Sequence, residues 1–442
     1  MSVITRIAPS PTGYLHFGLA RTALFSYLFT RKAGGEFILR IEDTDLARNE
    51  PEYEADIFAE LEWLGLVCDH RFRQSEHRAR HTECLRTLIE KNLAYESEEP
   101  AKDDPSKTVR VVRLKNSGET VVFTDLIRGE ISFDTTELGD FVIARAIDDP
   151  LYHLAVVVDD EDENVTHIIR GEDHISNTPR HILLQRALGF KTPAYAHIPL
   201  ILMPDRSKMS KRRNESSVKH YRERGILPEA LINYLALLGW NPGGEREFYT
   251  LPELVDLFDL SNVQKGGAIF DETKLLSVNQ HWMRQLSDSD FLVQMNDLGG
   301  RSFGELQKAV PLLKERAKTF QEAREMLDGE LKCLFEEPAI DPSQLVVKEP
   351  KDRPSMTKSA LEGLSEALKG LPEGVSAEAV KDSIMPLAEV EEANGKGGRG
   401  AVLWPLRYAL SGQERSPDPF TLIAILGIEE SISRIRKAIE LL

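Results

Sequence analysis

A loop containing histidine and glycine lies near the start of the chain, between a predicted strand and a predicted helix. It runs Pro9-Ser10-Pro11-Thr12-Gly13-Tyr14-Leu15-His16-Phe17-Gly18. In an open α/β sheet, nucleotide phosphates bind at this position, where a strand ends and a helix begins. Gly13 permits a sharp turn, Gly18 lets a ligand approach the backbone, and His16 can donate to phosphate oxygens. The spacing matches neither a P-loop nor a dinucleotide fingerprint, and an ordinary turn with a helix-capping histidine is the alternative.

A basic segment follows another predicted strand, His197–Met203, later in the chain. Residues 201–224 contain eight Lys or Arg and three acids, whereas the whole chain has a formal charge of −17. Lys208 and Lys211 are three positions apart in a loop and could contact a triphosphate from one side. A solvated basic loop is the alternative for this segment alone.

Together, the two motifs resemble the HIGH and KMSKS signatures of class I aminoacyl-tRNA synthetases. Other segments resemble the glutamyl-tRNA synthetase family, and the resemblance spans nearly the whole chain, strongly over 1–95 and 140–275 and more loosely over 290–395. The segments that carry it are Arg6–Gly13, Ala20–Phe25, Arg40–Asp45, Gln74–Glu76, Ile169–His174, Asn177–Pro179, Ser210–Arg212 and Pro405–Gly412.

The resemblance implies a two-step reaction with ATP and Mg²⁺. The glutamate α-carboxylate attacks the α-phosphate of ATP, and the 3′-terminal adenosine of tRNA-Glu then takes the glutamyl group. A carboxylate is already ionised at pH 7, so the first step needs alignment and charge stabilisation and no general base. By resemblance the catalytic residues are His16, Gly18, Lys208 and Lys211, and the ATP-binding residues are Pro9, Thr12, Gly13, His16, Gly18, Met209, Ser210 and Lys211.

A glutamate pocket must hold two carboxylates and one ammonium group, and bidentate arginines suit the carboxylates. The resemblance places Arg6, Ala8, Ser10, Glu42, Tyr152, Arg170 and His174 in this pocket. Arg170 matters most for identity, because related glutaminyl enzymes carry a neutral residue there. For the arginines taken singly the alternative is a surface salt bridge, and for Tyr152 it is a place in the core.

Three features depart from the family pattern. Val156 stands where some relatives have asparagine. The acids Asp159–Glu163 follow the predicted strand of Tyr152, and we expect a solvated hairpin tip there, not a metal site. Residues 96–108 replace a longer stretch that carries zinc ligands in some relatives. With only three cysteines, at 68, 84 and 333, the sequence predicts no zinc site and no disulfide framework.

Alternating strands and helices must position these residues. We expect strands at Val3–Ala8 and Glu36–Ile41, and helices at Gly18–Lys32, from Pro51 and over Glu76–Lys91, an order that implies a doubly wound parallel sheet. Residues 96–108 are predicted to form a linker. Strands are then expected at Val109–Leu114, Val121–Ile127, Phe141–Ile147 and Leu151–Val158, a βα unit at Thr166–Leu188, and helices at Pro228–Leu238 and Pro252–Phe258.

The resulting fold prediction is an α/β Rossmann-like catalytic domain of the class I synthetase kind, with a small inserted acceptor-binding domain, followed by an α-helical anticodon-binding region. The predicted ranges are 1–95 and 146–215 for the catalytic halves, 96–145 for the insertion, 216–290 for a stem-contact domain and 291–442 for the anticodon-binding domain. Arg316 and Arg407 are weak candidates for tRNA contacts, with a solvated helix arginine as the alternative for Arg316. Residues 395–400 resemble a glycine-rich linker.

Composition limits the remaining choices. A hydrophobic content of 41% with 29% charged residues is typical of a soluble globular protein, and no apolar run reaches a membrane span. We expect a cytoplasmic monomer without membrane partners. A glutamyl-queuosine synthetase would lack the C-terminal third, and a glutaminyl enzyme is disfavoured by Arg170 and by that region's helical pattern. A catalytically silent RNA-binding relative and a small-molecule nucleotidyltransferase remain as rivals, and charging of tRNA-Gln is left open.

Overall fold

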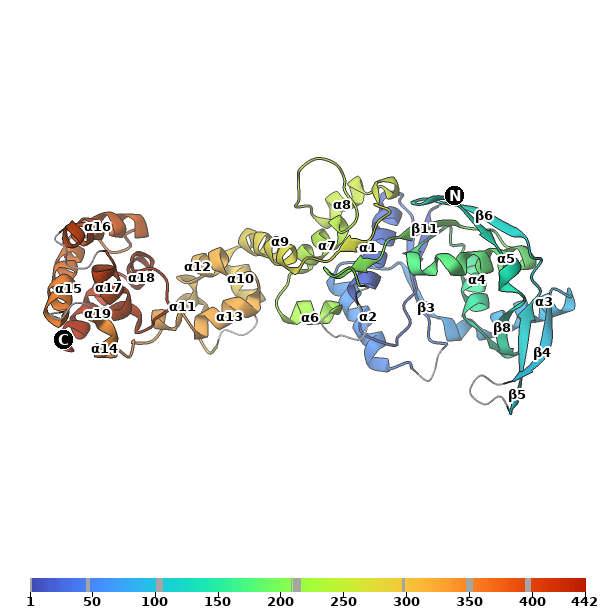
Figure 1. Cartoon of the computed structure of the whole chain (residues 1–442), viewed down its shortest axis with the longest axis horizontal. Coiled ribbons are helices and arrows are strands. Elements are labelled where there is room, and N and C mark those ends of the chain that lie inside the picture. Colours follow the sequence, from blue (N-terminus) through green and yellow to red (C-terminus); the bar gives the residue numbers. More distant parts are fainter. Residues whose placement is uncertain are drawn as a thin grey trace. The chain divides into compact units, whose positions relative to one another are not determined.

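A mostly parallel sheet organises the N-terminal part of the chain. The computed structural model describes residues 2–44, 48–100, 106–207, 209, 216–295, 299–346, 353–393 and 399–442 (Figure 1). Within these residues seven strands pair in the order β3-β2-β1-β10-β11-β6-β7. Their bounds are β1 Ile4–Ile7, β2 Glu36–Ile41, β3 His70–Arg73, β6 Thr120–Asp125, β7 Gly129–Asp134, β10 His167–Gly171 and β11 Ala194–Ile198. Every pairing is parallel except the β6–β7 hairpin, which confirms the predicted α/β class.

Helices connect these strands much as their sequence periodicity predicts. Helix α1 (Phe17–Lys32) buries Ala20, Leu24 and Leu28 completely. Proline in the first turn starts α2 (Pro51–Trp63) and α5 (Thr178–Leu188), where its fixed φ suits a helix and its missing N–H has no helical acceptor to lose. The expected third helix is a short 3₁₀ turn, η1 (Gln74–His77), followed by α3 (Arg78–Glu90).

The prediction of a strand at Leu151–Val158 is wrong, because this segment forms helix α4 (Tyr152–Asp162). An apolar run buried on all sides has no alternation that distinguishes a strand from a helix. Here α4 packs against α3 and α5, and Leu154 and Val158 belong to the core that these helices share with the sheet. The expected hairpin tip is also wrong at its first two acids, since Asp159 and Asp160 are 0% and 3% exposed on this helix.

A second, four-stranded antiparallel sheet contains part of the predicted linker. It consists of β4 (Ala94–Pro100), β5 (Thr108–Leu114), β8 (Phe141–Ala146) and β9 (Asp149–Pro150). Residues 96–100 pair with 108–112, and residues 101–105 lie outside the described part of the chain. Strand β4 exposes alternate side chains, so its polar residues resemble a linker in the sequence. Strand β7 was not expected, and with β6 it extends the main sheet.

The remaining elements of this compact unit, which spans Met1–Trp282, follow β11 in the chain. The predicted strand His197–Met203 is divided at Pro199–Leu200 into the end of β11 and a short β12 (Ile201–Leu202), which pairs with β13 (Ala268–Ile269). Short helices follow: α6 (Val218–Glu223), α7 (Pro228–Leu237), α8 (Leu251–Leu257) and most of α9 (Glu272–Gln285). Helix α7 matches its predicted bounds within one residue.

The second unit, Met283–Leu442, is helical in its described residues, as predicted. Its elements are α10 (Asp288–Gln294), α11 (Phe303–Gln307), α12 (Val310–Arg316), α13 (Phe320–Asp328), η6 (Lys332–Leu334), α14 (Pro342–Leu345), α15 (Arg353–Lys369), α16 (Ala377–Ala393), α17 (Gly400–Ser411), α18 (Pro419–Leu426) and α19 (Ile428–Glu440). The buried Arg434 of α19 donates to the carbonyls of Cys333 and Leu410 at 2.7 and 2.8 Å. No helix in the described residues is both long and apolar enough to cross a membrane. The predicted linker at 395–400 falls mostly outside the described residues, and the finer domain ranges stay predictions.

Candidate active site

A cavity lies where β1, β10 and β11 end and α1 begins, the edge at which open α/β sheets bind ligands. Nine of the residues predicted from the sequence line it: Arg6, Ala8, His16, Gly18, Glu42, Tyr152, Arg170, His174 and Met209. The sequence did not identify several further lining residues, among them Arg21, Thr22, Asp173 and Ser216. The structure therefore brings residues predicted to bind phosphate and residues predicted to bind glutamate into one site.

The other predicted residues lie elsewhere or cannot be placed. Pro9, Ser10, Thr12 and Gly13 are described, but they do not line this cavity, and Ser10 and Thr12 are exposed. The backbone of Gly13 is outside the left-handed region, so its conformation does not require glycine. Lys208, Ser210 and Lys211 lie outside the described residues, and their roles stay predictions.

His16 combines the two alternatives that the sequence left open. It caps α1, where its Nδ1 accepts from the Leu19 amide at 3.2 Å, and it also lines the cavity. Because Nδ1 is an acceptor, the neutral ring carries its proton on Nε2, the form that can donate to an anion. A Cβ atom at Gly18 would lie 3.2 Å from the His16 ring. Glycine at this position therefore makes room for the imidazole as well as for a ligand.

Neighbouring elements hold the histidine loop on both sides. The Leu15 amide donates to Asp56 of α2 at 2.8 Å, and the Leu15 carbonyl accepts from the Val218 amide at the start of α6, also at 2.8 Å. Met209 and Ser216 both line the same cavity. The chain segments before and after the signature lysine at 211 thus reach the site that contains His16.

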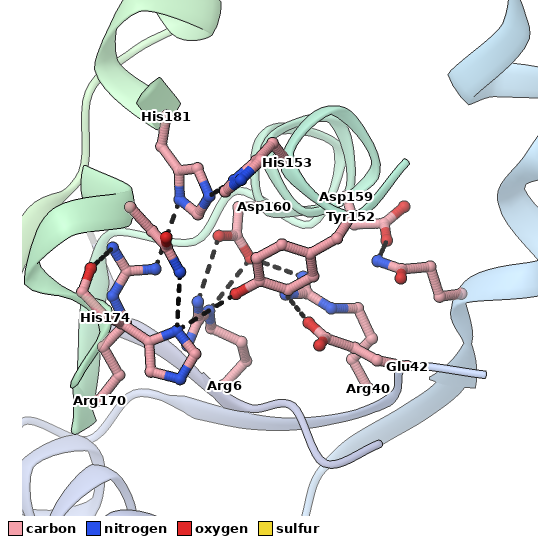
Figure 2. A network of polar contacts seen from close by, with 12 residues as sticks. Arg6, Arg40, Glu42, Tyr152, His153, Asp159, Asp160, Arg170, His174 and His181 are labelled. Carbon is pink, nitrogen blue, oxygen red and sulfur yellow. Dashed lines mark hydrogen bonds and ion pairs between the residues drawn. The ribbon is translucent and has the colours of Figure 1, made fainter. Parts of the chain in front are cut away.

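Arg6 belongs to a buried, charge-balanced cluster (Figure 2). Its Nε and Nη2 atoms donate to Asp160 at 3.1 and 3.4 Å, and Arg40 donates to the same carboxylate at 2.6 Å. Arg40 also donates to Glu42 at 3.2 Å. Burial opposes ionisation of Asp160, but the two guanidinium groups outweigh it and lower the pKa of Asp160. Two cations and two carboxylates therefore face one another, and Arg6 is held by an acid that the sequence did not identify as part of the site.

The neighbouring Asp159 points to other elements, because successive helical residues are about 100° apart. It accepts from Gln74 at 2.7 Å and lies 2.6 Å from His81 and 3.3 Å from His77. These partners come from η1 and α3. Asp159 thus joins α4 to those elements, whereas Asp160 holds Arg6, which lines the cavity.

Arg170 has very different surroundings, although it is equally buried, with 6% of its surface exposed. Its guanidinium donates to His197 Nε2 at 3.2 Å, Thr178 Oγ1 at 2.6 Å and the His174 carbonyl at 3.4 Å, and its Nη1 lies 3.4 Å from His181 Nδ1. None of these acceptors is a carboxylate, and no ion pair of Arg170 occurs in the described chain. Burial lowers the pKa of Arg170, and a ligand carboxylate in the cavity would favour its charged form.

The side chains around Arg170 stay neutral near pH 7. Burial and the charge of Arg170 lower the pKa of His174 to about 4 and that of His181 well below its usual value. Burial raises the pKa of Tyr152 to about 12, and its hydroxyl lies 3.5 Å from His174 Nδ1. Burial lowers the pKa of His153 to about 4 as well. The positive charge among these side chains is therefore that of Arg170.

The candidate tRNA residues lie in the second unit and already have protein partners. Arg316 ends α12 and pairs with Glu330 at 3.4 Å. Arg407 donates to the carbonyls of Glu414 at 2.8 Å and Ser416 at 3.4 Å, and its guanidinium carbon lies 4.8 Å from the centre of the Trp404 ring. Their contacts with tRNA stay predictions. No cluster of three potential metal ligands occurs in the described residues.

Sequence reasoning missed Asp160, Arg40, His181, His197 and Asp125, although these residues set the charge and geometry of the site. Two signals were present. Two adjacent acids at the end of an apolar run indicate buried partners once that run is taken as a helix. Arg40 near the end of the second strand and Glu42 just beyond it are two positions apart, a spacing that places strand side chains on one face.

Two family models match the chain. The catalytic domain of class I tRNA synthetases (E and Q) matches residues 2–103 and 97–277, and an anticodon binding domain matches 280–439. Among curated relatives, glutamate–tRNA ligase 1 of Acidithiobacillus ferrooxidans is 39% identical over 479 residues, and the glutamate–tRNA ligase of Aquifex aeolicus is 38% identical over 477 residues. In both cases the match covers 99% of each chain.

A solved structure agrees with these relatives. The crystal structure of a glutamate tRNA ligase from Elizabethkingia meningosepticum, in complex with its amino acid, is 33% identical, covers 100% of this chain and 99% of its own, and has a TM-score of 0.84. Together with a cavity that holds the histidine loop and an uncompensated arginine, these similarities show that the chain belongs to the class I glutamate–tRNA ligases.

Proposed function

We propose that this chain charges tRNA-Glu with L-glutamate at the expense of ATP. The observation that carries the proposal is the cavity beside α1, where Arg170 is a buried cation with no ion pair among the described residues and His16 lies in the same wall. A substrate with a carboxylate would neutralise Arg170. A nucleotide would place its phosphates near the helix N-terminus.

The charges of the cavity suit an amino acid with two carboxylates. We assign the side-chain carboxylate of glutamate to Arg170 and the α-carboxylate to the Arg6 side, with Glu42 facing the ammonium group. Arg6 can approach a carboxylate in only one orientation, because Asp160 fixes its guanidinium. Burial raises the pKa of Glu42, and an ammonium group nearby would favour its ionised form.

The first chemical step then depends on alignment. An oxygen of the glutamate α-carboxylate forms a bond to the α-phosphorus of ATP, while the bond from that phosphorus to the pyrophosphate oxygen breaks and pyrophosphate leaves. His16 Nε2–H and the backbone at Gly18 would stabilise the phosphates, and Lys208 and Lys211 would act from the signature loop. Mg²⁺ bound to ATP would neutralise part of the phosphate charge. In the second step a ribose hydroxyl of the tRNA attacks the glutamyl carbonyl and AMP leaves.

The second unit would read the anticodon, as its match to an anticodon binding domain suggests. Arg407 is stacked near Trp404, so the pair could extend its stack with an unpaired base. Arg316 could exchange its exposed pairing with Glu330 for a phosphate or base. We further propose that the protein acts as a cytoplasmic monomer without a protein-bound zinc ion.

The proposal is tested with purified full-length protein by ATP–pyrophosphate exchange in the presence of glutamate and tRNA, and by aminoacylation of tRNA-Glu and tRNA-Gln. We expect glutamate- and tRNA-dependent exchange and charging of tRNA-Glu. A folded protein that binds tRNA and shows no exchange would refute the proposal in favour of a silent RNA-binding relative. Charging of tRNA-Gln would widen the substrate range without changing the chemistry.

A further inference from the structure

The hydrogen bonds of Arg170 leave one of its donors for a ligand. A guanidinium carries five N–H groups. Nε–H is directed to His197, both groups of Nη2 to Thr178 and the His174 carbonyl, and one of Nη1 to His181. Within the described residues the fifth, on Nη1, has no protein acceptor, and Arg170 lines the cavity. The acceptors that orient the other four therefore determine where the fifth is directed.

His197 is the register partner of Arg170 in the adjacent parallel strand, and Asp125 fixes its tautomer. Asp125 Oδ2 lies 2.6 Å from His197 Nδ1, so this nitrogen carries the proton and Nε2 presents a lone pair to Arg170. The same carboxylate accepts from the backbone amides of Ile127, Arg128 and His197 at 3.0, 2.8 and 3.0 Å. Burial opposes its ionisation, but these donors outweigh it and lower the pKa of Asp125.

A second histidine pair supports the opposite side of the guanidinium. His181 Nδ1 accepts from Arg170, so its proton lies on Nε2, which is 3.1 Å from His153 Nδ1 (Figure 2). Thr178 accepts from Arg170 through its hydroxyl oxygen, and its hydroxyl donates to the His174 carbonyl at 3.4 Å. Neutral groups with fixed proton positions therefore hold Arg170 on both sides.

Neutral acceptors orient the Arg170 guanidinium without balancing its charge, whereas carboxylates would do both. A carboxylate beside Arg170 would balance its charge, and a substrate with a negative side chain would gain little over a neutral one. An imidazole with its proton on Nε2 would present a donor to a cation and displace it. The arrangement found here orients the guanidinium and leaves its charge to the ligand.

We propose that Asp125 and His197 are positioning residues that set amino acid specificity, by presenting a neutral lone pair that aims the Arg170 guanidinium at the side-chain carboxylate of the substrate. This inference rests on the proposed function, because it concerns the glutamate pocket of that same site. Neither residue was predicted from the sequence, and neither lines the cavity.

Two substitutions at one position separate the two hydrogen bonds of His197. The side-chain oxygen Oε1 of glutamine can take the place of Nε2, so His197→Gln keeps an acceptor for Arg170. Asparagine can take the place of Nδ1, so His197→Asn keeps a donor to Asp125 and loses the acceptor. We expect His197→Asn to raise the KM for glutamate roughly 10- to 150-fold, the effect of losing one hydrogen bond to a charged group, and to reduce the preference for glutamate over glutamine. We expect His197→Gln to stay within about 5-fold of the wild type and the KM for ATP to be unchanged in both.

The matched control is His167→Asn, the same change at the start of β10, away from the cavity, with an expected KM for glutamate within about 2-fold of the wild type. If His197→Asn lowers the melting temperature but leaves the glutamate KM and the preference over glutamine like those of His197→Gln, His197 is only structural and the inference is wrong. Loss of preference in Arg170→Gln together with that result would overturn the inference and leave the proposed function intact. If Arg170→Gln keeps the preference, the assignment of the pocket itself is wrong.

A measurement independent of activity tests the tautomer. In protein with ¹⁵N-labelled histidine, two-dimensional ¹⁵N–¹H spectra distinguish the two neutral forms, and the signal missing from His197→Asn assigns His197. We expect the form with the proton on Nδ1, with and without glutamate. A proton on Nε2 would overturn the inference, because His197 could then not accept from Arg170.

Discussion

Two substitutions that each remove one buried charge, one beside the cavity and one in its wall, should differ sharply in their cost to stability. Asp160→Asn removes a carboxylate that accepts three hydrogen bonds from Arg6 and Arg40, at 2.6 to 3.4 Å. It leaves two buried cations with Glu42 as their one remaining acid in the cluster. Breaking a buried ion pair in this way typically costs about 3–5 kcal/mol. We expect a loss of that size in the free energy of unfolding.

Arg170→Gln should cost much less, because no carboxylate loses a partner. The glutamine amide nitrogen can occupy the position of Nε and keep the bond to His197. The lost bonds to Thr178, His181 and the His174 carbonyl involve neutral acceptors and are worth about 1 kcal/mol each, while removal of a buried ion returns several kcal/mol of desolvation cost. We expect a net change within about 1 kcal/mol of zero. Activity should behave oppositely: losing a charged partner in the pocket should reduce kcat/KM for glutamate by at least about 30-fold and remove the preference over glutamine.

The assay is urea unfolding of the full chain followed by tryptophan fluorescence. The four tryptophans are Trp63, Trp240, Trp282 and Trp404, of which the first three lie in the N-terminal unit. A Trp404→Phe background makes the signal report on that unit alone. Asp159→Asn, one position away and equally buried, is the control for loss of a buried acid that serves no cation of the cavity. The reasoning is refuted if Arg170→Gln destabilises the unit as much as Asp160→Asn does, since Arg170 would then have a compensating partner.

Three further predictions follow from the same contacts. The pKa of His153 is about 4 in the fold, against 6.5 for an ordinary histidine, so the unfolded chain binds the additional proton and stability falls as pH drops below about 6.5. Between pH 7.5 and 5.5, His153→Asn should therefore reduce this loss of unfolding free energy by about 1.4 kcal/mol, measured by urea titrations at the two pH values. An unchanged loss would contradict the assignment. Thr250→Ala removes a capping box with Glu253 at the start of α8 and should cost about 1 kcal/mol by the same assay, whereas no measurable cost would show that the box contributes nothing. In native protein a thiol reagent at pH 8 should modify Cys68 alone, because burial raises the pKa of Cys84 and of Cys333 to about 11; mass spectrometry of the modified chain checks this, and early labelling of either buried thiol would contradict it.

The sequence predicts well those elements whose periodicity is clear. Helix α1 and strand β2 match their expected bounds within one residue, since a helical stripe and a bounded apolar run lead to single interpretations. Helix α4 fails for the opposite reason: its apolar residues are continuous because neighbours bury it on every side. Because of that error, Asp159 and Asp160, which are buried in the structure, were predicted to lie in a solvated hairpin tip.

The site shows the same limit at the level of side chains. The family resemblance placed Arg6 and Arg170 together, and in the structure both lie near the carboxyl ends of strands in one parallel sheet. Their partners could not be found in this way. The contacts of Arg170 with His181 and His197 depend on how α5 and β11 pack beside β10, which no spacing along the chain records.

The unlike surroundings of the two arginines explain how one pocket can treat two carboxylates differently. Every amino acid has an α-carboxylate, so binding it requires a well-oriented Arg6 guanidinium more than a strong positive charge. Asp160 orients that guanidinium and also balances its charge. The side-chain carboxylate distinguishes glutamate from glutamine, and in the proposed assignment Arg170 would meet it with an unbalanced charge. Glutamine would bury this cation without neutralising it and would leave the fifth N–H facing an amide that can accept but carries no charge. The empty pocket already bears the cost of burying the Arg170 charge. A glutamate carboxylate would remove that cost and a glutamine amide would not, and this difference is the source of the discrimination.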